Sequence, residues 1–263
     1  MARFTTLYSG SSGNCAVLEE DGRFLLVDMG KSCRQTTGLL RQLELDPAQL
    51  GGILVTHEHA DHVAGLAVFL KKWRVPVYGC AASLDFMAQR NLVPADAQLE
   101  DMDGRPGDVA GFGVESFTTS HDSVACCGYR ITTPRGRVLS IATDLGYVSD
   151  EVLANLYCAD AVALEANYDP YLLMKGPYPE YLKYRIHSNR GHLSNDACAQ
   201  TVVRLLQAGC RNFTLCHISQ ENNQPELALG SVQLALNEAG IRPEEGTIVR
   251  AARRHEPTPW IEL

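Results

Sequence analysis

Three histidines and one aspartate occupy four of six consecutive positions in this chain. The segment from His57 to His62 reads His-Glu-His-Ala-Asp-His, an HxHxDH pattern that contains three of the chain's eight histidines. Imidazole and carboxylate groups are favoured ligands of zinc and neighbouring divalent ions. His57 and His59 can share one ion from an extended loop, while Asp61 and His62, at the start of a following helix, can face a second. A histidine-rich surface loop is the alternative, and this concentration of ligands disfavours it.

Further candidate ligands follow short apolar runs. His121 follows the run that ends at Ser120, Asp144 follows Thr143, and His217 follows Cys216. A single histidine at the end of a strand can simply be a hydrogen-bonded surface residue, so each of these residues alone leaves both interpretations open. Their occurrence together with the HxHxDH motif indicates a site for two metal ions.

The apolar runs before these residues have the length and β-branched composition of strands. The expected strands are Phe24–Val27, Ile53–Thr56, Val114–Ser120, Val138–Thr143, Ala161–Leu164 and Phe213–Cys216. Helical spacing of apolar residues predicts helices at Asp61–Trp73, Asn195–Ala208 and Pro225–Ala239. Chelators at successive strand ends can converge on one edge of a rigid scaffold. The pattern favours an α/β fold with two packed sheets and flanking helices, in one domain over residues 1–263.

The motifs resemble those of the metallo-β-lactamase superfamily over most of the chain. Asp28 matches the first motif of that family and HxHxDH the second. Ser120-His121-Asp122, Thr143-Asp144-Leu145 and Cys216-His217 match the third, fourth and fifth. The resemblance implies an αββα sandwich of two mixed β-sheets flanked by helices, with two adjacent divalent ions, zinc or manganese.

The same resemblance implies which residues hold the ions. His57, His59 and His121 would hold the first ion, Asp61, His62 and His217 the second, and Asp144 would bridge both. Asp28, Glu165 and Asn167 are expected behind the ligands, where hydrogen bonds fix ligand orientation.

Three segments are similar to the YycJ/WalJ-like branch, whose members are proposed 5′→3′ exonucleases and related phosphodiesterases. They are residues 9–15 (SGSSGNC), 191–195 (GHLSN) and 217–223 (HISQENN). The stretch Leu164–Asp169 also resembles that branch, except that Tyr168 stands where a histidine is expected. Any catalytic role of that position is therefore in question in this chain.

Two ions about 3.5–4 Å apart can activate a water molecule and clamp the oxygens of a phosphodiester. We expect Asp61 to help hold that nucleophile and His192 to donate a proton to the leaving oxygen; a structural loop role is the alternative for His192. The candidates for substrate contact are Ser11, Ser12, Asn14, Ser194 and Asn195. A tight turn and a helix cap would explain these five residues as well.

Residues 171–185 interleave four tyrosines with three cations and one glutamate. Aromatic rings stack on bases and cations meet phosphates, so this segment could contact nucleic acid. An amphipathic helix that packs its tyrosines on the sandwich is an equally good explanation.

Composition bounds the remaining possibilities. The net charge of −8 is the wrong sign for a protein that coats nucleic acid, although it allows an enzyme with a local basic face. The nine cysteines have no framework-like spacing, and no leader or long apolar run is found, so we expect a cytoplasmic protein with reduced thiols and no membrane contact. The favoured function is a metal-dependent phosphodiesterase, a 5′→3′ exonuclease with DNA as substrate. The alternative is hydrolysis of a thioester, a lactone or a cyclic nucleotide.

Overall fold

Alternating side chains along the strands divide the protein into four layers. In the computed structural model, which describes residues 1–263, β3 (Arg23–Val27) turns Leu25 and Val27 toward a core between two sheets. Phe24 and Leu26 of the same strand point to the opposite face, where helices cover them. Since successive side chains of a strand point to opposite faces, a strand that is apolar throughout must be covered on both sides.

The two sheets have seven strands each, and in both an antiparallel half continues into a parallel half. The first sheet has the order β14 (Ile261–Glu262), β1 (Ala2–Tyr8), β2 (Cys15–Glu20), β3, β4 (Leu50–Leu54), β5 (Val77–Gly79) and β6 (Leu99–Asp101). The second has the order β13 (Ile248–Ala251), β12 (Asn212–Cys216), β11 (Ala161–Glu165), β10 (Val138–Ala142), β9 (Cys127–Thr132), β8 (Phe112–Thr118) and β7 (Gly107–Val109).

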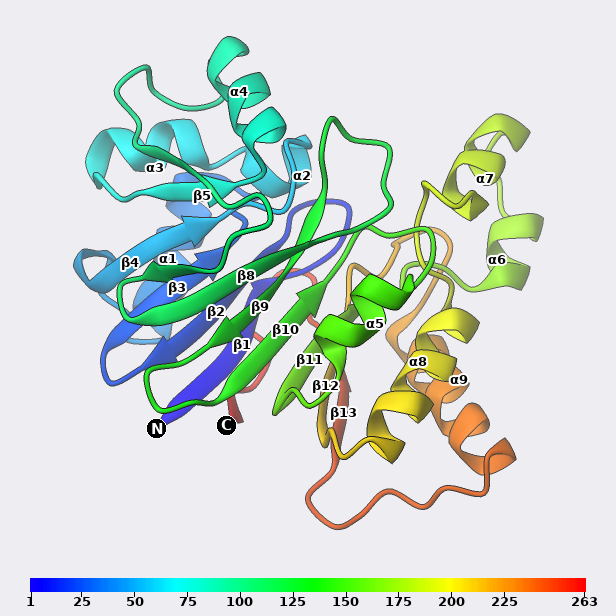
Figure 1. Cartoon of the computed structure of the whole chain (residues 1–263). Coiled ribbons are helices and arrows are strands. Elements are labelled where there is room, and N and C mark those ends of the chain that lie inside the picture. Colours follow the sequence, from blue (N-terminus) through cyan, green and yellow to red (C-terminus); the bar gives the residue numbers. More distant parts are fainter.

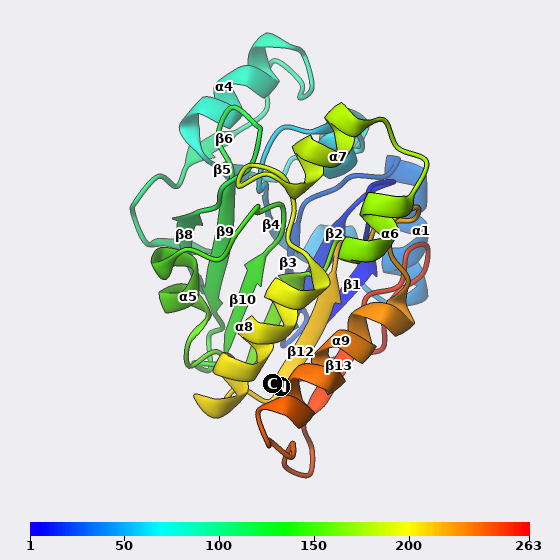
Figure 2. The same ribbon diagram turned by 90° about the vertical axis from the view of Figure 1, so that its right-hand side faces the viewer.

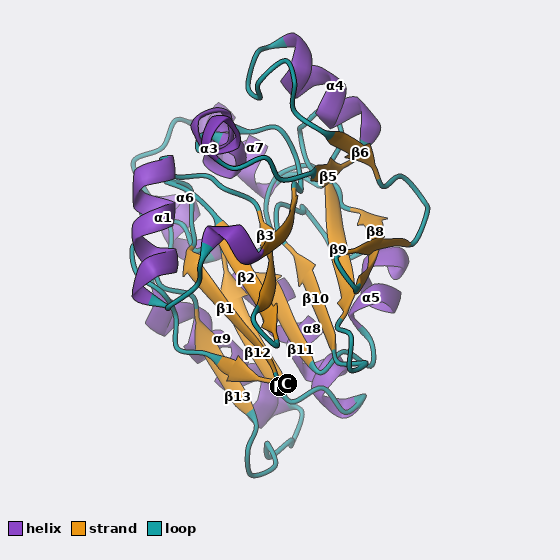
Figure 3. Cartoon of the chain, turned by 90° about the vertical axis from the view of Figure 1, so that its left-hand side faces the viewer, coloured by secondary structure: helices purple, strands orange, loops and turns teal.

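Helices cover the outer face of each sheet (Figure 1). The first sheet is covered by α1 (Cys33–Gln42), α2 (Ala60–Val63), α3 (Leu66–Lys72) and α4 (Ala81–Gln89). The second is covered by α5 (Asp150–Leu156), α8 (Asn195–Gln207) and α9 (Pro225–Glu238). Figure 2 shows α8 and α9 side by side over the second sheet, and Figure 3 shows α1 and α3 on the opposite side of the molecule. The predicted αββα sandwich of mixed sheets is confirmed.

The helix expected over residues 61–73 is interrupted. A continuous helix would pair Gly65 N–H with the Asp61 carbonyl, but Asn14 N–H donates to that carbonyl at 2.8 Å. Gly65 N–H instead donates to the Met29 carbonyl at 2.9 Å, and the chain forms the two helices α2 and α3. The break lets the end of α2 approach the loop that follows β3.

Two short helices, α6 (Pro170–Lys175) and α7 (Glu180–His187), lie apart from the covering layers, beyond the ends of the strands (Figures 1 and 2). A single 3₁₀ turn, η1 (Pro47–Gln49), precedes β4. None of the helices combines the length and the apolar character that crossing a membrane requires.

Candidate metal centre

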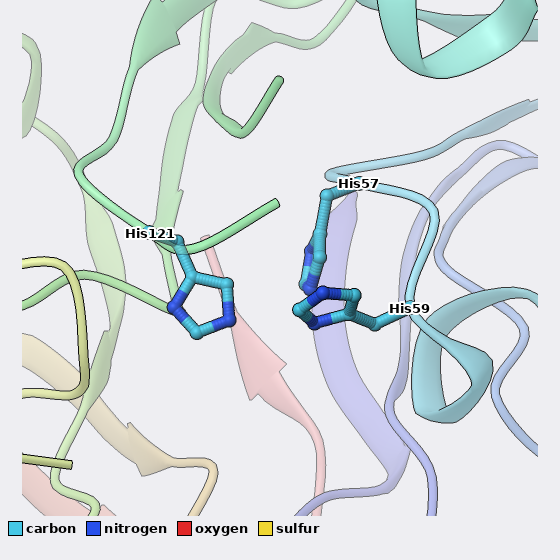
Figure 4. A group of neighbouring side chains, drawn as sticks. All are labelled: His57, His59 and His121. Carbon is cyan, nitrogen blue, oxygen red and sulfur yellow. The ribbon is translucent and has the colours of Figure 1, made fainter. Parts of the chain in front are cut away.

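The first group of candidate ligands joins two loops from different sheets. His57 and His59 lie in the loop after β4, and His121 lies in the loop after β8 and points toward them (Figure 4). The ring centroids of His57 and His59 are 4.5 Å apart, and each lies 5.1 Å from the centroid of His121. One nitrogen from each ring falls within 4.8 Å of the others, which is close enough for one shared ion.

The second group lies beside the first. Asp61 Oδ2 is 3.6 Å from His62 Nε2 and 3.4 Å from His217 Nε2. Asp144 stands between the groups, with its carboxylate 3.2 Å from His62 Nε2 and 3.7 Å from His121 Nε2. The seven residues predicted from sequence as ligands are therefore gathered at one place, in two neighbouring sets with a carboxylate between them.

Two of the candidate ligands, and the aspartate that lies behind them, have an unusual backbone conformation. Asp28, Asp144 and His217 have φ angles of 64°, 57° and 53°, in the left-handed region that residues other than glycine rarely adopt. Each comes directly after, or two residues after, the end of a buried strand: β3, β10 and β12. Strained backbone of this kind concentrates at functional sites, where surrounding structure holds it in place.

The donor atoms fit divalent metal ions. Three buried polar atoms in the cluster have no hydrogen-bond partner: His57 Nε2, Asp144 Oδ2 and His217 Nε2. Buried polar atoms are nearly always paired, so three orphans in one cluster need a common partner. Imidazole nitrogens and carboxylate oxygens are common ligands of divalent metal ions, and the two neighbouring sets are consistent with two such ions.

The charges of the site also call for cations. Burial lowers the pKa of His57 well below its ordinary value, and neighbouring imidazoles add to that shift. Burial opposes protonation of His217 too, but the carboxylates of Asp144, Asp61 and Glu165 outweigh it and raise the pKa of His217 to about 10. The pKa of Asp144 is held well below its usual range, because the charges of His217 and His62 overcome the effect of burial. The carboxylates thus favour positive charge at His217, whereas burial and the neighbouring imidazoles disfavour it at His57.

Asp28 connects the HxHxDH loop to the end of β3. Its Oδ2 lies 2.7 Å from His62 Nδ1, and its Oδ1 accepts a hydrogen bond from Thr56 N–H at 2.9 Å. This contact fixes the ring so that His62 Nε2 faces Asp61 and Asp144. Asp28 is in the position expected of a residue behind the ligands.

Glu165, at the end of β11 in the second sheet, likewise orients imidazole rings by hydrogen bonds. Its Oε1 lies 2.8 Å from Nδ1 of both His192 and His217. Its Oε2 accepts from the backbone N–H groups of Leu145 and Leu193 at 3.0 and 3.1 Å. One fully buried carboxylate therefore sets the orientation of two imidazoles. Asn167 supports the same loop by donating to the His217 carbonyl at 2.8 Å.

The five candidates for substrate contact are dispersed. Ser11 lines the cavity beside the ligands, and Ser12 is exposed outside it. Asn14 is buried, with Nδ2 3.2 Å from His62 Nε2. Ser194 caps α8, and Asn195 is buried in hydrogen bonds with Asn223.

Of the five, we therefore retain only Ser11 as a candidate for substrate contact. Asn14 instead positions the motif. Ser194 and Asn195 do not line the cavity. Their polar groups are engaged elsewhere, Ser194 in capping α8 and Asn195 in its hydrogen bonds with Asn223.

Three supporting residues were missed by sequence reasoning. Ser9 Oγ accepts from His217 N–H at 2.8 Å, and the Gly191 carbonyl lies 2.9 Å from His121 Nδ1. Glu58, inside the motif, accepts from Val124 N–H at 2.8 Å and so joins the loop of the first sheet to the loop that follows His121. Glu58 could have been suspected, since a charged residue between ligands needs a partner. Ser9 and Gly191 begin two of the segments similar to the YycJ/WalJ-like branch, but that similarity gave neither residue a role.

Tyr168, the departure from the expected histidine, does not line the cavity. It is buried with Leu173 and Ile186 in a small apolar cluster, and its hydroxyl lies 2.9 Å from His187 Nδ1. Burial raises the pKa of Tyr168 to about 12. Its place is under α6 and α7, where it fixes those helices.

Comparison with known proteins agrees with this geometry. The family described as "Beta-lactamase superfamily domain" matches residues 23–218. The chain is 38% identical over 241 residues to "Exodeoxyribonuclease YycJ" of Bacillus anthracis, covering 90% of both chains. It is 36% identical over 244 residues to "Exodeoxyribonuclease WalJ" of Streptococcus pneumoniae, covering 91% of this chain and 90% of the relative.

A solved structure has the same fold. It is the metallo-β-lactamase fold protein YhfI from Bacillus subtilis, with a TM-score of 0.74, 16% identity and coverage of 98% of this chain and 99% of the other. Family match, relatives and fold agree, and the chain belongs to the metallo-β-lactamase superfamily, as a relative of the YycJ and WalJ exodeoxyribonucleases.

Proposed function

We propose that the protein is a dinuclear metal-dependent phosphodiesterase that removes nucleotides from the 5′ end of DNA. The observation that carries the proposal is the pair of histidine and aspartate clusters joined by Asp144. The relatives that match about nine-tenths of the chain are exodeoxyribonucleases by name, which supports DNA as the substrate. Zinc and manganese are the ions that suit the donor set.

The cavity beside the ligands has a volume of about 240 Å³. That is below the roughly 300–1,000 Å³ of pockets for drug-sized ligands. Its lining includes His59, Asp61 and His192, so a substrate phosphate that enters the cavity meets the candidate ligands and the proposed proton donor. Divalent ions bound there would activate a water molecule and stabilise the negative charge that develops at phosphorus.

Asp61 is suited to orient the attacking water. Its side chain is about one-quarter exposed and lines the cavity, whereas Asp144 is buried. A carboxylate with an accessible oxygen can accept a hydrogen bond from water while it also binds an ion. We therefore assign Asp61 both roles.

His192 is suited to donate a proton to the leaving oxygen. Its Nδ1 is held by Glu165, which leaves the other ring nitrogen for the cavity that the ring lines. A proton donor needs a fixed ring and access to the substrate, and His192 has both. His187 and His255 are less suitable, because His187 is paired with Tyr168 and His255 lies against Lys31 on the surface.

The test combines metal analysis with cleavage of 5′-labelled single- and double-stranded DNA. Wild-type protein loaded with zinc or manganese should release 5′ nucleotides, Asp61→Ala should lose cleavage, and His192→Ala should keep its metal and lose about 10²–10⁴-fold in rate. Wild-type protein that carries two ions and leaves every DNA substrate intact would overturn the assignment. The search would then move to small esters and cyclic phosphates.

A further inference from the structure

The segment from Pro170 to His192, here called the α6–α7 arm, forms one wall of the metal cavity. Tyr178, Leu182 and Arg185 of the arm face the same cavity as the ligands His59 and His217. Figure 2 shows α7 lying across the end of the molecule where the loops of the two sheets meet. A nucleic-acid strand that enters the cavity therefore lies next to the arm.

The arm is held in place without its outer tyrosines. Its own small core consists of Tyr168, Leu173 and Ile186, with Tyr178 and Leu182 packed against it. A Cβ at Gly191 would lie 2.2 Å from the Arg185 carbonyl, so the base of the arm also requires close backbone contact. The sequence left open whether the tyrosines of this segment pack on the sandwich. That explanation is wrong for Tyr171, Tyr181 and Tyr184, whose side chains are exposed.

Tyr171, Tyr181 and Tyr184 are 69%, 74% and 73% exposed. In the rest of the chain Tyr147 is the one other exposed large aromatic side chain. Tyr181 and Tyr184 are three residues apart on α7 and therefore neighbours on its surface. Three exposed rings on one small arm exceed what scattered surface residues explain, and a cluster of this kind indicates a binding surface.

The charge of the arm is opposite to that of the protein. The arm carries Lys175, Arg185 and Arg190, and its remaining cation, the buried Lys183, is paired with the single carboxylate of Glu180, while the whole chain has a net charge of −8. Arg185 is four residues from Tyr181, on the same side of α7, and lines the cavity. Its guanidinium is held in place by Asp122, with Nη2 3.0 Å from Oδ1 and a second contact from Nε. Asp122 offsets part of the charge of Arg185, but Lys175 and Arg190 leave the arm with an excess of positive charge beside the exposed rings, and this combination complements a nucleic-acid strand.

We propose that the α6–α7 arm binds the unpaired end of a nucleic-acid strand, with bases stacked on Tyr181 and Tyr184 and the backbone beside Arg185. This inference rests on the proposed nuclease function and names its substrate class. In a duplex the stack covers every base face except the outer face of the terminal pair, so two successive bases can lie on the two rings only where the end of the strand is unpaired.

The test uses the metal-loaded full chain and fluorescence anisotropy. The probe is a short labelled single strand with phosphorothioate linkages, compared with the same strand carrying abasic spacers. Wild-type protein should bind the strand with bases about tenfold or more tightly than the abasic strand, since each stacked base contributes about 1–3 kcal/mol. This comparison needs no variant and so does not depend on whether any variant folds.

The double variant Tyr181→Ala/Tyr184→Ala should lose that preference. The matched variant Tyr181→Phe/Tyr184→Phe should keep it, because the rings remain, and so should Tyr147→Ala, which removes an exposed tyrosine outside the arm. Equal binding of both strands by wild-type protein, or a preference that survives in the double alanine variant, overturns the inference. If either result is found in an enzyme that still cleaves DNA, only the role proposed for the arm is wrong. If the metal-loaded enzyme cleaves no DNA, the proposed function itself is wrong.

Discussion

His217 Nδ1 lies 2.8 Å from Glu165 Oε1, and this contact leaves His217 Nε2 on the side of the ring that faces Asp61. The same carboxylate oxygen holds His192. A ligand of the candidate metal site and the proposed proton donor therefore depend on one buried acid. Any change at Glu165 acts on both.

Glu165→Ala should lower metal affinity about 10–100-fold, the usual effect of losing a residue behind a ligand. It should also destabilise the fold, because the N–H groups of Leu145 and Leu193 lose their acceptor. Glu165→Gln keeps the volume and an acceptor oxygen and should be the milder variant. Zinc titration and thermal unfolding measure the two effects separately. Wild-type metal affinity in the alanine variant would contradict the role assigned to Glu165.

Removal of metal should lower the melting temperature. An ion that binds only the folded state, at a free concentration of about 100 times its Kd, raises the free energy of unfolding by about 2.7 kcal/mol. For a chain of this size 1 kcal/mol corresponds to about 2–4 °C, so chelation should lower Tm by about 5–10 °C per ion. Calorimetry before and after chelation, and after addition of zinc or manganese, checks this. The prediction fails if the chelated protein, shown to be free of metal, melts at an unchanged temperature.

Gly30→Ala should disrupt the metal centre. A Cβ at Gly30 would lie 1.7 Å from the Asp61 carbonyl oxygen, so the loop that follows β3 and the start of α2 would have to separate. We expect a loss of several kcal/mol in unfolding free energy and loss of bound metal. The matched control is Gly38→Ala in α1, where nothing lies within 4 Å of the added Cβ. That change should stabilise the helix by about 0.5–1 kcal/mol, and equal effects of the two substitutions would be inconsistent with the close approach described for Gly30.

Thiol labelling should distinguish the exposed cysteine from the others. All nine cysteines are free, Cys158 is exposed, Cys33 is partly buried and the remaining seven are buried. Burial raises the pKa of Cys210 to about 11, so at pH 8 its thiol stays protonated and does not react. A disulfide reagent at pH 8 should modify Cys158 rapidly, Cys33 more slowly and all nine after denaturation. Rapid labelling of Cys210 in folded protein would show that its environment opens.

The sequence was sufficient for the parts of the site that follow from local periodicity. An apolar run of strand length that ends in a chelator located His121, Asp144 and His217, since alternation fixes which face each strand buries. The positions of Asn14 and Asn195 could not be obtained in this way. Their hydrogen-bond partners, His62 and Asn223, are distant in sequence, so no local pattern predicts these contacts. The interruption of the helix at Gly65 also depends on contacts between residues distant in sequence. Asn14 N–H donates to the Asp61 carbonyl, and Gly65 N–H donates to the Met29 carbonyl.

The outer tyrosines of the α6–α7 arm illustrate a different difficulty. Tyr168 and Tyr181 lie in the same short region and have the same side chain, yet one is buried under the arm and the other is exposed. Which tyrosine fills the small core depends on how α6 and α7 meet, and that is a property of packing between helices. Sequence reasoning could therefore suggest aromatic contact with nucleic acid but could not select the residues.

Both candidate ion sites draw their ligands from the two sheets. The loops of the first sheet supply His57, His59, Asp61 and His62, and those of the second supply His121, Asp144 and His217. A nascent chain thus exposes its HxHxDH segment long before residue 217 has been synthesised. Neither half alone can complete a ligand set, so the candidate metal centre forms only after the halves have docked. Metal occupancy then reports complete assembly, and a chain divided between β6 and β7 would regain it only when both fragments are mixed.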